Sequence, residues 1–183
     1  SRVSAADFEA LIKDAIRSYE RDFKMLNLLL FPETLDILAQ EDRVLSQPGG
    51  SLLLVGRSGA GRRSTVAVIA HLQGLEIVSP KLGRGYGMKQ FKADLQFVVK
   101  KAGIENEKLL LYLEDYQIRS EDMLEAVNSL ISSGEVPGLF NSAELDPLLS
   151  PIKEAFQRDG KFRTPYQFFL SRVQKNVRVV LAF

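Results

Sequence analysis

The chain has 183 residues, of which 45% are hydrophobic and 26% charged, and this is the profile of one globular domain with a sizeable core. Its 24 Lys and Arg balance 23 Asp and Glu, which argues against a dedicated nucleic-acid binder. The lack of cysteine excludes disulfides and thiolate metal sites, and the apolar runs are too short to cross a membrane.

The N-terminal fifty residues are expected to form two helices. Apolar residues recur at helical spacing between Phe8 and Phe23, and Ser4 followed by Asp7 resembles an N-terminal cap. Pro32 is expected to begin a second helix, which a turn rich in Gly and Pro ends. No secretion signal precedes these helices, so we expect a cytosolic protein.

Strands then alternate with helices, which predicts an α/β fold with a parallel sheet. The wholly apolar run Leu52–Val55 is expected to be a strand buried on both faces. Residues 134–160 look irregular. Further strands are expected at 77–78, 109–113 and 177–181. Helices are expected after the glycine-rich loop, around 91–99, from 120 and from 164. The expected helix stops are Gly74, Gly103 and Gly134. We expect 1–50 to lead into the module and 51–183 to form its core.

A phosphate-binding loop is indicated at Gly56–Arg63, which has the spacing G-x-x-x-x-G-K-[ST] between a strand and a helix. Small residues let the backbone curl so that its N–H groups point at phosphate oxygens, and the helix start adds its positive end. The residues expected to cradle the phosphates are Ser58, Gly59, Ala60, Gly61, Arg62, Arg63 and Ser64. The alternative is a tight turn with incidental glycines.

Two positions of this loop depart from the motif. Arg62 stands where lysine is usual, and Arg63 stands where a Ser or Thr hydroxyl binds Mg²⁺. Arginine has no acceptor oxygen and cannot ligate a metal. A shifted frame with Arg63-Ser64 in these roles breaks the link to Gly61, so the first frame is preferred. We therefore expect no metal-ligand set here, and Mg²⁺ binding is called into question.

Residues 109–115 resemble a Walker B segment, a buried strand that ends in two acids. The usual order is Asp and then Glu, whereas here Glu114 precedes Asp115, and a displacement of about 1 Å can cost roughly 100-fold in rate. These two are the candidate catalytic residues. We expect Arg63 to point toward Glu114 and fill the space of Mg²⁺, or else to swing to solvent. The alternative for the acids is a solvated strand end.

Other residues favour ordinary roles. His71 is the only histidine, so it cannot form a metal cluster and is expected to pack or to lie at the surface. The arginines of the glycine-rich loop lack interleaved aromatic residues, which argues against nucleic acid. Phe168, Phe169 and Val173 are expected in the core.

The chain resembles the dynein heavy chain, specifically the fourth AAA+ module of its motor ring. The resemblance runs from about residue 25 to the end, and its most specific block is 128–140, NSLISSGEVPGLF. It also rests on 43–50, 52–61, 91–95 and 102–103. Within dyneins, residues 79–81, 84–86 and 114–117 are most similar to the cytoplasmic dynein 2 subgroup, the retrograde motors of cilia and flagella.

The resemblance implies a three-layer P-loop AAA+ large subdomain, cut before the helical lid, that binds ADP or ATP. It implies that Leu30 and Phe31 approach the adenine. It further implies neighbouring AAA+ modules of the same heavy chain as partners, microtubule contact only through regions outside this chain, and a place in the cytoplasm, the cytoskeleton and the cilium or flagellum. Neither nucleic acid nor a membrane is an expected partner.

Three functions are compatible with these residues. The preferred one is a regulatory or structural nucleotide-binding module with a degenerate site. An active ATPase that contributes turnover to the motor is the alternative, so enzymatic activity stays open. A stand-alone P-loop kinase is disfavoured because the chain shows no arginine-rich lid.

Overall fold

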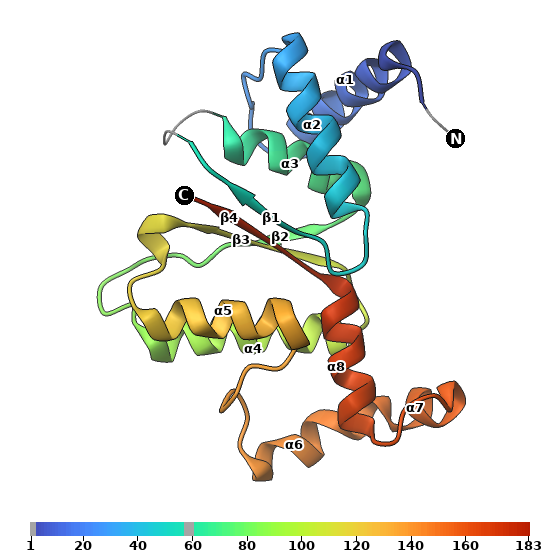
Figure 1. Cartoon of the computed structure of the whole chain (residues 1–183), viewed down its shortest axis with the longest axis vertical. Coiled ribbons are helices and arrows are strands. Elements are labelled where there is room, and N and C mark those ends of the chain that lie inside the picture. Colours follow the sequence, from blue (N-terminus) through green and yellow to red (C-terminus); the bar gives the residue numbers. More distant parts are fainter. Residues whose placement is uncertain (1–2, 57–60) are drawn as a thin grey trace.

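The computed structural model describes residues 3–56 and 61–183. Its centre is a parallel sheet of four strands in the order β1-β4-β3-β2, and helices cover both faces (Figure 1). The strands are β1 (Ser51–Leu54), β2 (Glu76–Val78), β3 (Leu109–Glu114) and β4 (Val177–Ala182). This arrangement confirms the α/β prediction.

One face of the sheet is covered by α1 (Ala5–Asp22), α2 (Pro32–Leu45) and α3 (Arg62–Gln73). Ser4 caps α1 by accepting a hydrogen bond from the Asp7 N–H, and Pro32 begins α2, as predicted. His71 packs at this face: its Nε2 lies 3.0 Å from Ser18 Oγ, and its ring meets Tyr19 edge-on.

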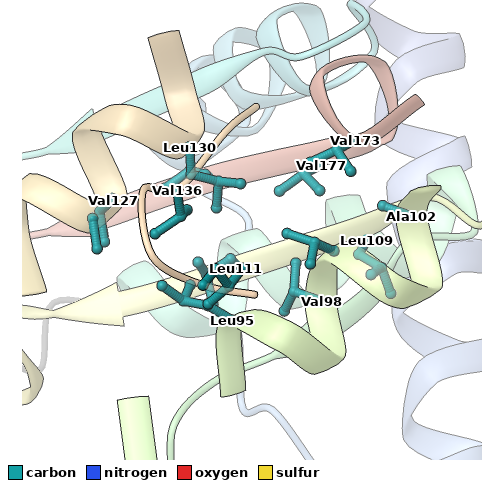
Figure 2. Packing of buried hydrophobic residues seen from close by; sticks show 14 of the residues in the cluster. Leu95, Val98, Ala102, Leu109, Leu111, Val127, Leu130, Val136, Val173 and Val177 are labelled. Atoms are coloured by element: carbon teal, nitrogen blue, oxygen red, sulfur yellow. The ribbon is translucent and has the colours of Figure 1, made fainter. Parts of the chain in front are cut away.

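The other face is covered by α4 (Met88–Gly103), α5 (Glu121–Ser133) and α8 (Pro165–Asn176). Figure 2 shows Leu95 and Val98 of α4 packed against Leu109 and Leu111 of β3. The predicted core residues Phe168, Phe169 and Val173 are buried on α8. Each such side chain contributes about 1.5–3 kcal/mol to folding, so this face supplies much of the stability.

The expectation that β1 is buried on both faces is wrong. Leu53 is 60% exposed and Val55, just after the strand, is 80% exposed. The physical reason is position: β1 is an edge strand that pairs with β4 alone, and its Leu53 side chain projects to the face where α4 and α5 lie under the other strands. Leu52 and Leu54, on the opposite side, pack against the α1–α3 cluster.

Residues 134–160 are more regular than expected. They contain α6 (Ser142–Leu149), a 3₁₀ turn (Ser150–Ile152) and α7 (Lys153–Asp159). A second 3₁₀ turn (Asp115–Gln117) lies earlier in the chain, directly after β3. Asn141 and Glu144 form a reciprocal capping box at the start of α6. Leu149 and Ile152 are buried in the larger core, and this long-range packing stabilises helices too short to form alone.

Gly103 is not a helix stop, which corrects a third expectation. Gly74 and Gly134 do end their helices in the left-handed conformation, whereas α4 continues through Gly103 to a cap at Ile104. A Cβ on Gly103 would lie 2.3 Å from the Phe169 ring, so this glycine allows α4 and α8 to approach closely.

Replacing Gly103 by alanine is therefore expected to destabilise the fold. The added methyl overpacks the α4–α8 contact and should lower the free energy of unfolding by about 1–3 kcal/mol. Urea unfolding measures this loss. Gly83→Ala is the matched control because a Cβ there meets no atom within 4 Å. Equal midpoints for the two variants would contradict the close-approach explanation.

Among the described residues, no helix combines the length and the apolar character needed to span a membrane.

Candidate functional site

The phosphate-loop motif lies where the carboxyl ends of β1, β3 and β4 meet the first turn of α3. Gly61 adopts the left-handed conformation at φ 76°, and α3 begins at Arg62. The predicted phosphate-binding residues Ser58, Gly59 and Ala60 lie outside the described part of the chain. Ligands of open parallel sheets bind at this edge, so the fold places the motif where its chemistry requires.

Arg62 does not project freely from the loop. Its Nη1 donates to the Phe183 carbonyl at 2.8 Å and to the Leu54 carbonyl at 3.3 Å. The Gly56 N–H donates to the same Phe183 carbonyl at 3.0 Å. The guanidinium in the lysine position thus joins the ends of β1 and β4, because the two N–H groups of Nη1 can reach two carbonyls at once.

Arg63 lies over an aromatic ring and not in an ion pair. Its guanidinium carbon is 5.3 Å from the centroid of the Tyr112 ring, and the described residues contain no Arg63–Glu114 contact within ion-pair distance. The expected direct pairing with Glu114 is therefore wrong. Tyr112 and Glu114 share one side of β3, so the arginine meets the tyrosine ring, with which a cation–π contact is favourable.

The tyrosine connects the arginine to the acid. The Tyr112 hydroxyl donates to Glu114 Oε1 at 3.1 Å. Burial and this hydrogen bond raise the pKa of Tyr112 to about 12, although the charges of Arg62 and Arg63 pull it downward. Tyr112 is therefore a neutral donor at pH 7, and its hydroxyl uses one of the acceptor sites of the Glu114 carboxylate.

The two predicted acids have different surroundings. Glu114 ends β3 and is half-buried, whereas Asp115 begins a 3₁₀ turn, is exposed, and accepts a hydrogen bond from the Tyr116 N–H at 2.8 Å. The buried Gln117 fixes this turn: its Oε1 accepts from the Glu114 N–H at 2.7 Å. Gln117 thus fixes the backbone at Glu114, while the Glu114 side chain accepts from the Tyr112 hydroxyl.

Gln117 is a site residue that the sequence reasoning missed. Its Nε2 donates to the Pro80 carbonyl at 2.7 Å and to Ser79 Oγ at 3.1 Å, which ties the end of β3 to the segment after β2. The signal that could have found it is a capping-box spacing, with Gln three residues after Glu114.

Glu41 is a second missed residue, at the contact between α2 and α3. It is 2% exposed, and its Oε1 accepts from the Thr65 hydroxyl at 2.9 Å, while Oε2 has no hydrogen-bond partner among the described residues. Burial raises the pKa of Glu41 to about 7. The sequence signal was a charged residue on an apolar stripe, because Leu38, Glu41 and Leu45 have helical spacing and are all buried.

The remaining predicted site residues lie around the start of α2 and α3. Leu30 is half-buried against the α1–α3 cluster, and Phe31 is the cap residue of α2 and 58% exposed. Ser64 follows Arg63 in the first turn of α3. Leu30, in the connection before α2, therefore packs against the same core cluster that contains Val66 of α3.

Comparison with known proteins identifies the family. Residues 26–183 match the family described as the P-loop containing dynein motor region D4. The cytoplasmic dynein 2 heavy chain 1 of Rattus norvegicus is 48% identical over 98% of this chain, and that of Homo sapiens is 47% identical over 98%. The corresponding protein of Chlamydomonas reinhardtii is 44% identical over 96% of the chain. This chain spans 4% of the length of each of these relatives.

The subgroup resemblance agrees with these identities, since the cytoplasmic dynein of Dictyostelium discoideum is 33% identical and human dynein axonemal heavy chain 17 is 31% identical. The family match over residues 26–183 agrees with the parallel sheet and with the position of the phosphate-loop motif between a strand and a helix. The chain belongs to the dynein heavy-chain family and forms its P-loop containing motor region D4.

Proposed function

We propose that this chain is a nucleotide-binding AAA+ module of a microtubule motor, with a regulatory or structural role and a site poorly suited to hydrolysis. The observation that carries the proposal is the placement of two guanidinium groups: Arg62 on the strand-end carbonyls and Arg63 over Tyr112. These are the positions of the phosphate-binding lysine and of the metal-binding hydroxyl.

The residues at the site do not fit a protein-held Mg²⁺. Arg63 has no acceptor oxygen, and Glu114 Oε1 already accepts from the Tyr112 hydroxyl. Asp115 lies in the exposed turn beyond the strand. A positive charge on Arg63 can instead balance the phosphates of ADP or ATP, alongside the amino end of α3. Binding would then need no metal ligand from the chain.

The proposed setting rests on the family to which the chain belongs. We propose that neighbouring AAA+ modules of the same heavy chain are its partners, and that microtubules are reached through regions outside this chain. The similarity to cytoplasmic dynein 2 supports a place in the cytoplasm and on the cytoskeleton of a cilium or flagellum. Because this chain spans 4% of those proteins, the activity of the whole motor is part of the proposal.

An active ATPase is the second candidate. It is favoured by the position of Glu114 and Asp115 at the end of β3, the edge at which the phosphate loop also lies. The two candidates differ in their need for Mg²⁺, since metal charge is a principal source of phosphoryl-transfer catalysis.

Nucleotide binding is therefore expected to depend little on Mg²⁺. Calorimetric titration of the chain with millimolar ADP should give binding whose affinity changes by less than roughly tenfold, or about 1.4 kcal/mol, when EDTA replaces Mg²⁺. Circular dichroism should verify that the protein is folded in both buffers. A flat trace from folded protein would remove the nucleotide-binding proposal, and a larger loss in EDTA would contradict the role of Arg63.

A further inference from the structure

A pocket of about 570 Å³ lies far from the phosphate loop, at the opposite edge of the sheet. Asn106 and Lys175, which line it, lie two or three residues before the amino ends of β3 and β4, whereas the candidate nucleotide site lies at their carboxyl ends. Figure 1 shows α7 and the start of α8 on the side of the molecule away from the start of α3. A ligand here would not overlap with a nucleotide.

The charge of this pocket contrasts with that of the whole chain. Arg158, Lys161, Arg172 and Lys175 line it together with a single carboxylate, that of Asp159. The complete chain has a net charge of +1, so the surplus is local and not a general basic character. Basic residues that share a concave surface raise the local concentration of anions.

Most of these cations have no carboxylate partner in the described part of the chain. Among residues 3–56 and 61–183, Arg158 pairs with the exposed Glu154 at 3.4 Å, and no carboxylate lies within ion-pair distance of Lys161, Arg172 or Lys175. The helix dipole favours a cation near a helix C-terminus, and this explains the position of Lys175 in the last turn of α8. It does not explain the position of Lys161, which lies between α7 and α8.

The floor of the pocket is apolar, and one of the cations that line it, Arg172, is held in place. Ala155, Phe162 and Phe168 supply apolar surface. The guanidinium carbon of Arg172 lies 4.5 Å from the centroid of the Phe168 ring, and its Nη1 donates to the Ile104 carbonyl at 3.4 Å. A pocket that combines apolar surface with a few polar groups is the usual character of a binding site.

We propose that this pocket binds an acidic peptide segment of a protein partner, one that carries an apolar side chain among its carboxylates. The cations come from α7, from the segment after it and from α8, so their charges are spread along the rim. Spread charges suit several carboxylates, and the floor suits an apolar side chain.

A compact phosphate fits this pocket less well. Phosphate sites are typically built from backbone N–H groups at a helix N-terminus. Here α8 contributes Ser171, Arg172 and Lys175 from its C-terminal half, and α7 contributes Arg158 and Asp159 from its last turn. These parts of the two helices do not offer the free N–H groups that such a phosphate site uses.

Fluorescence anisotropy tests the proposal with a fluorescein-labelled peptide in which glutamates flank one phenylalanine. A peptide with glutamine in place of each glutamate is its control. The chain is expected to bind the acidic peptide, with an affinity that falls as salt is added, and to bind the control at least roughly tenfold more weakly.

Lys161→Gln/Lys175→Gln should weaken binding of the acidic peptide by roughly tenfold, because each exposed pair contributes a factor of a few. Lys161→Arg/Lys175→Arg should retain it, and Lys24→Gln/Lys89→Gln, which removes two exposed lysines outside the pocket, should bind as the unaltered chain does. Equal binding of both peptides, or unchanged binding by the first variant, would overturn the proposal. Displacement by pyrophosphate as effective as by unlabelled peptide would also overturn it, in favour of a compact anion.

Discussion

At pH 8, Glu41→Met is expected to be more stable than the unaltered chain by up to about 3 kcal/mol. The carboxyl of Glu41 has an ordinary pKa of 4.5, and burial raises the pKa to about 7 in the folded chain. Each pKa unit corresponds to about 1.4 kcal/mol. Above pH 7, ionisation of the buried carboxyl therefore lowers the free energy of unfolding by up to about 3 kcal/mol. Methionine has a similar length, and the Thr65 hydroxyl keeps the Arg62 carbonyl as an acceptor at 3.0 Å.

The direction of the pH dependence is the sharper part of this prediction. Because the folded pKa is raised, the stabilising effect of the protonated carboxyl is complete below pH 4.5 and is lost as the pH rises to about 7. The difference in the free energy of unfolding between Glu41→Met and the unaltered chain should therefore grow from pH 4.5 to 7 and then stay constant. Urea unfolding at several pH values measures it, and exposed Asp36→Asn on the same helix is the control. A difference that does not vary with pH would refute the assignment to Glu41.

The parts of the fold that the sequence predicted correctly depend on local rules. The Ser4 cap, the helix start at Pro32 and the left-handed stops at Gly74 and Gly134 each depend on a few neighbouring residues. Burial of a strand is different, because it depends on which helices happen to cover it. The apolar pattern of β1 therefore did not reveal that Leu53 is exposed at a sheet edge.

At the candidate site, too, features that depend on local sequence were predictable, and those that depend on distant residues were not. Motif spacing located Arg62, Arg63 and Glu114 at the carboxyl edge of the sheet, since strand, loop and helix are consecutive in the chain. The direction of each side chain was not predictable in this way. Arg62 binds a carbonyl of Phe183, which is 121 residues away, and Arg63 lies over a tyrosine that the motif does not include. The contacts of a long side chain depend on which acceptors the folded chain brings near it, and these acceptors can be distant in the sequence.

Phosphate release from ATP by this chain is expected to be at least roughly 100-fold slower than the ~1 s⁻¹ at the low end of ordinary enzymes. Arg63 removes a metal ligand, and the Tyr112 hydroxyl occupies an oxygen of Glu114. The acid that follows, Asp115, is exposed in a turn and is not held toward α3. A coupled phosphate-release assay on the purified chain gives the rate. Glu114→Gln is the control that separates slow turnover by this site from a contaminating ATPase.

A variant that restores the usual residues of the phosphate-loop motif tests metal binding and hydrolysis separately. In Arg62→Lys/Arg63→Thr the hydroxyl returns beside Glu114, so EDTA should weaken ADP binding by more than roughly tenfold, in contrast to the unaltered chain. Turnover should remain slow, because the order of Glu114 and Asp115 is unchanged and we expect a carboxylate displaced by about 1 Å to orient water poorly. Fast turnover in the restored variant would show that the arginines alone silence the site. Turnover near 1 s⁻¹ in the unaltered chain, abolished by Glu114→Gln, would instead establish the active ATPase, because a contaminant would not respond to that substitution.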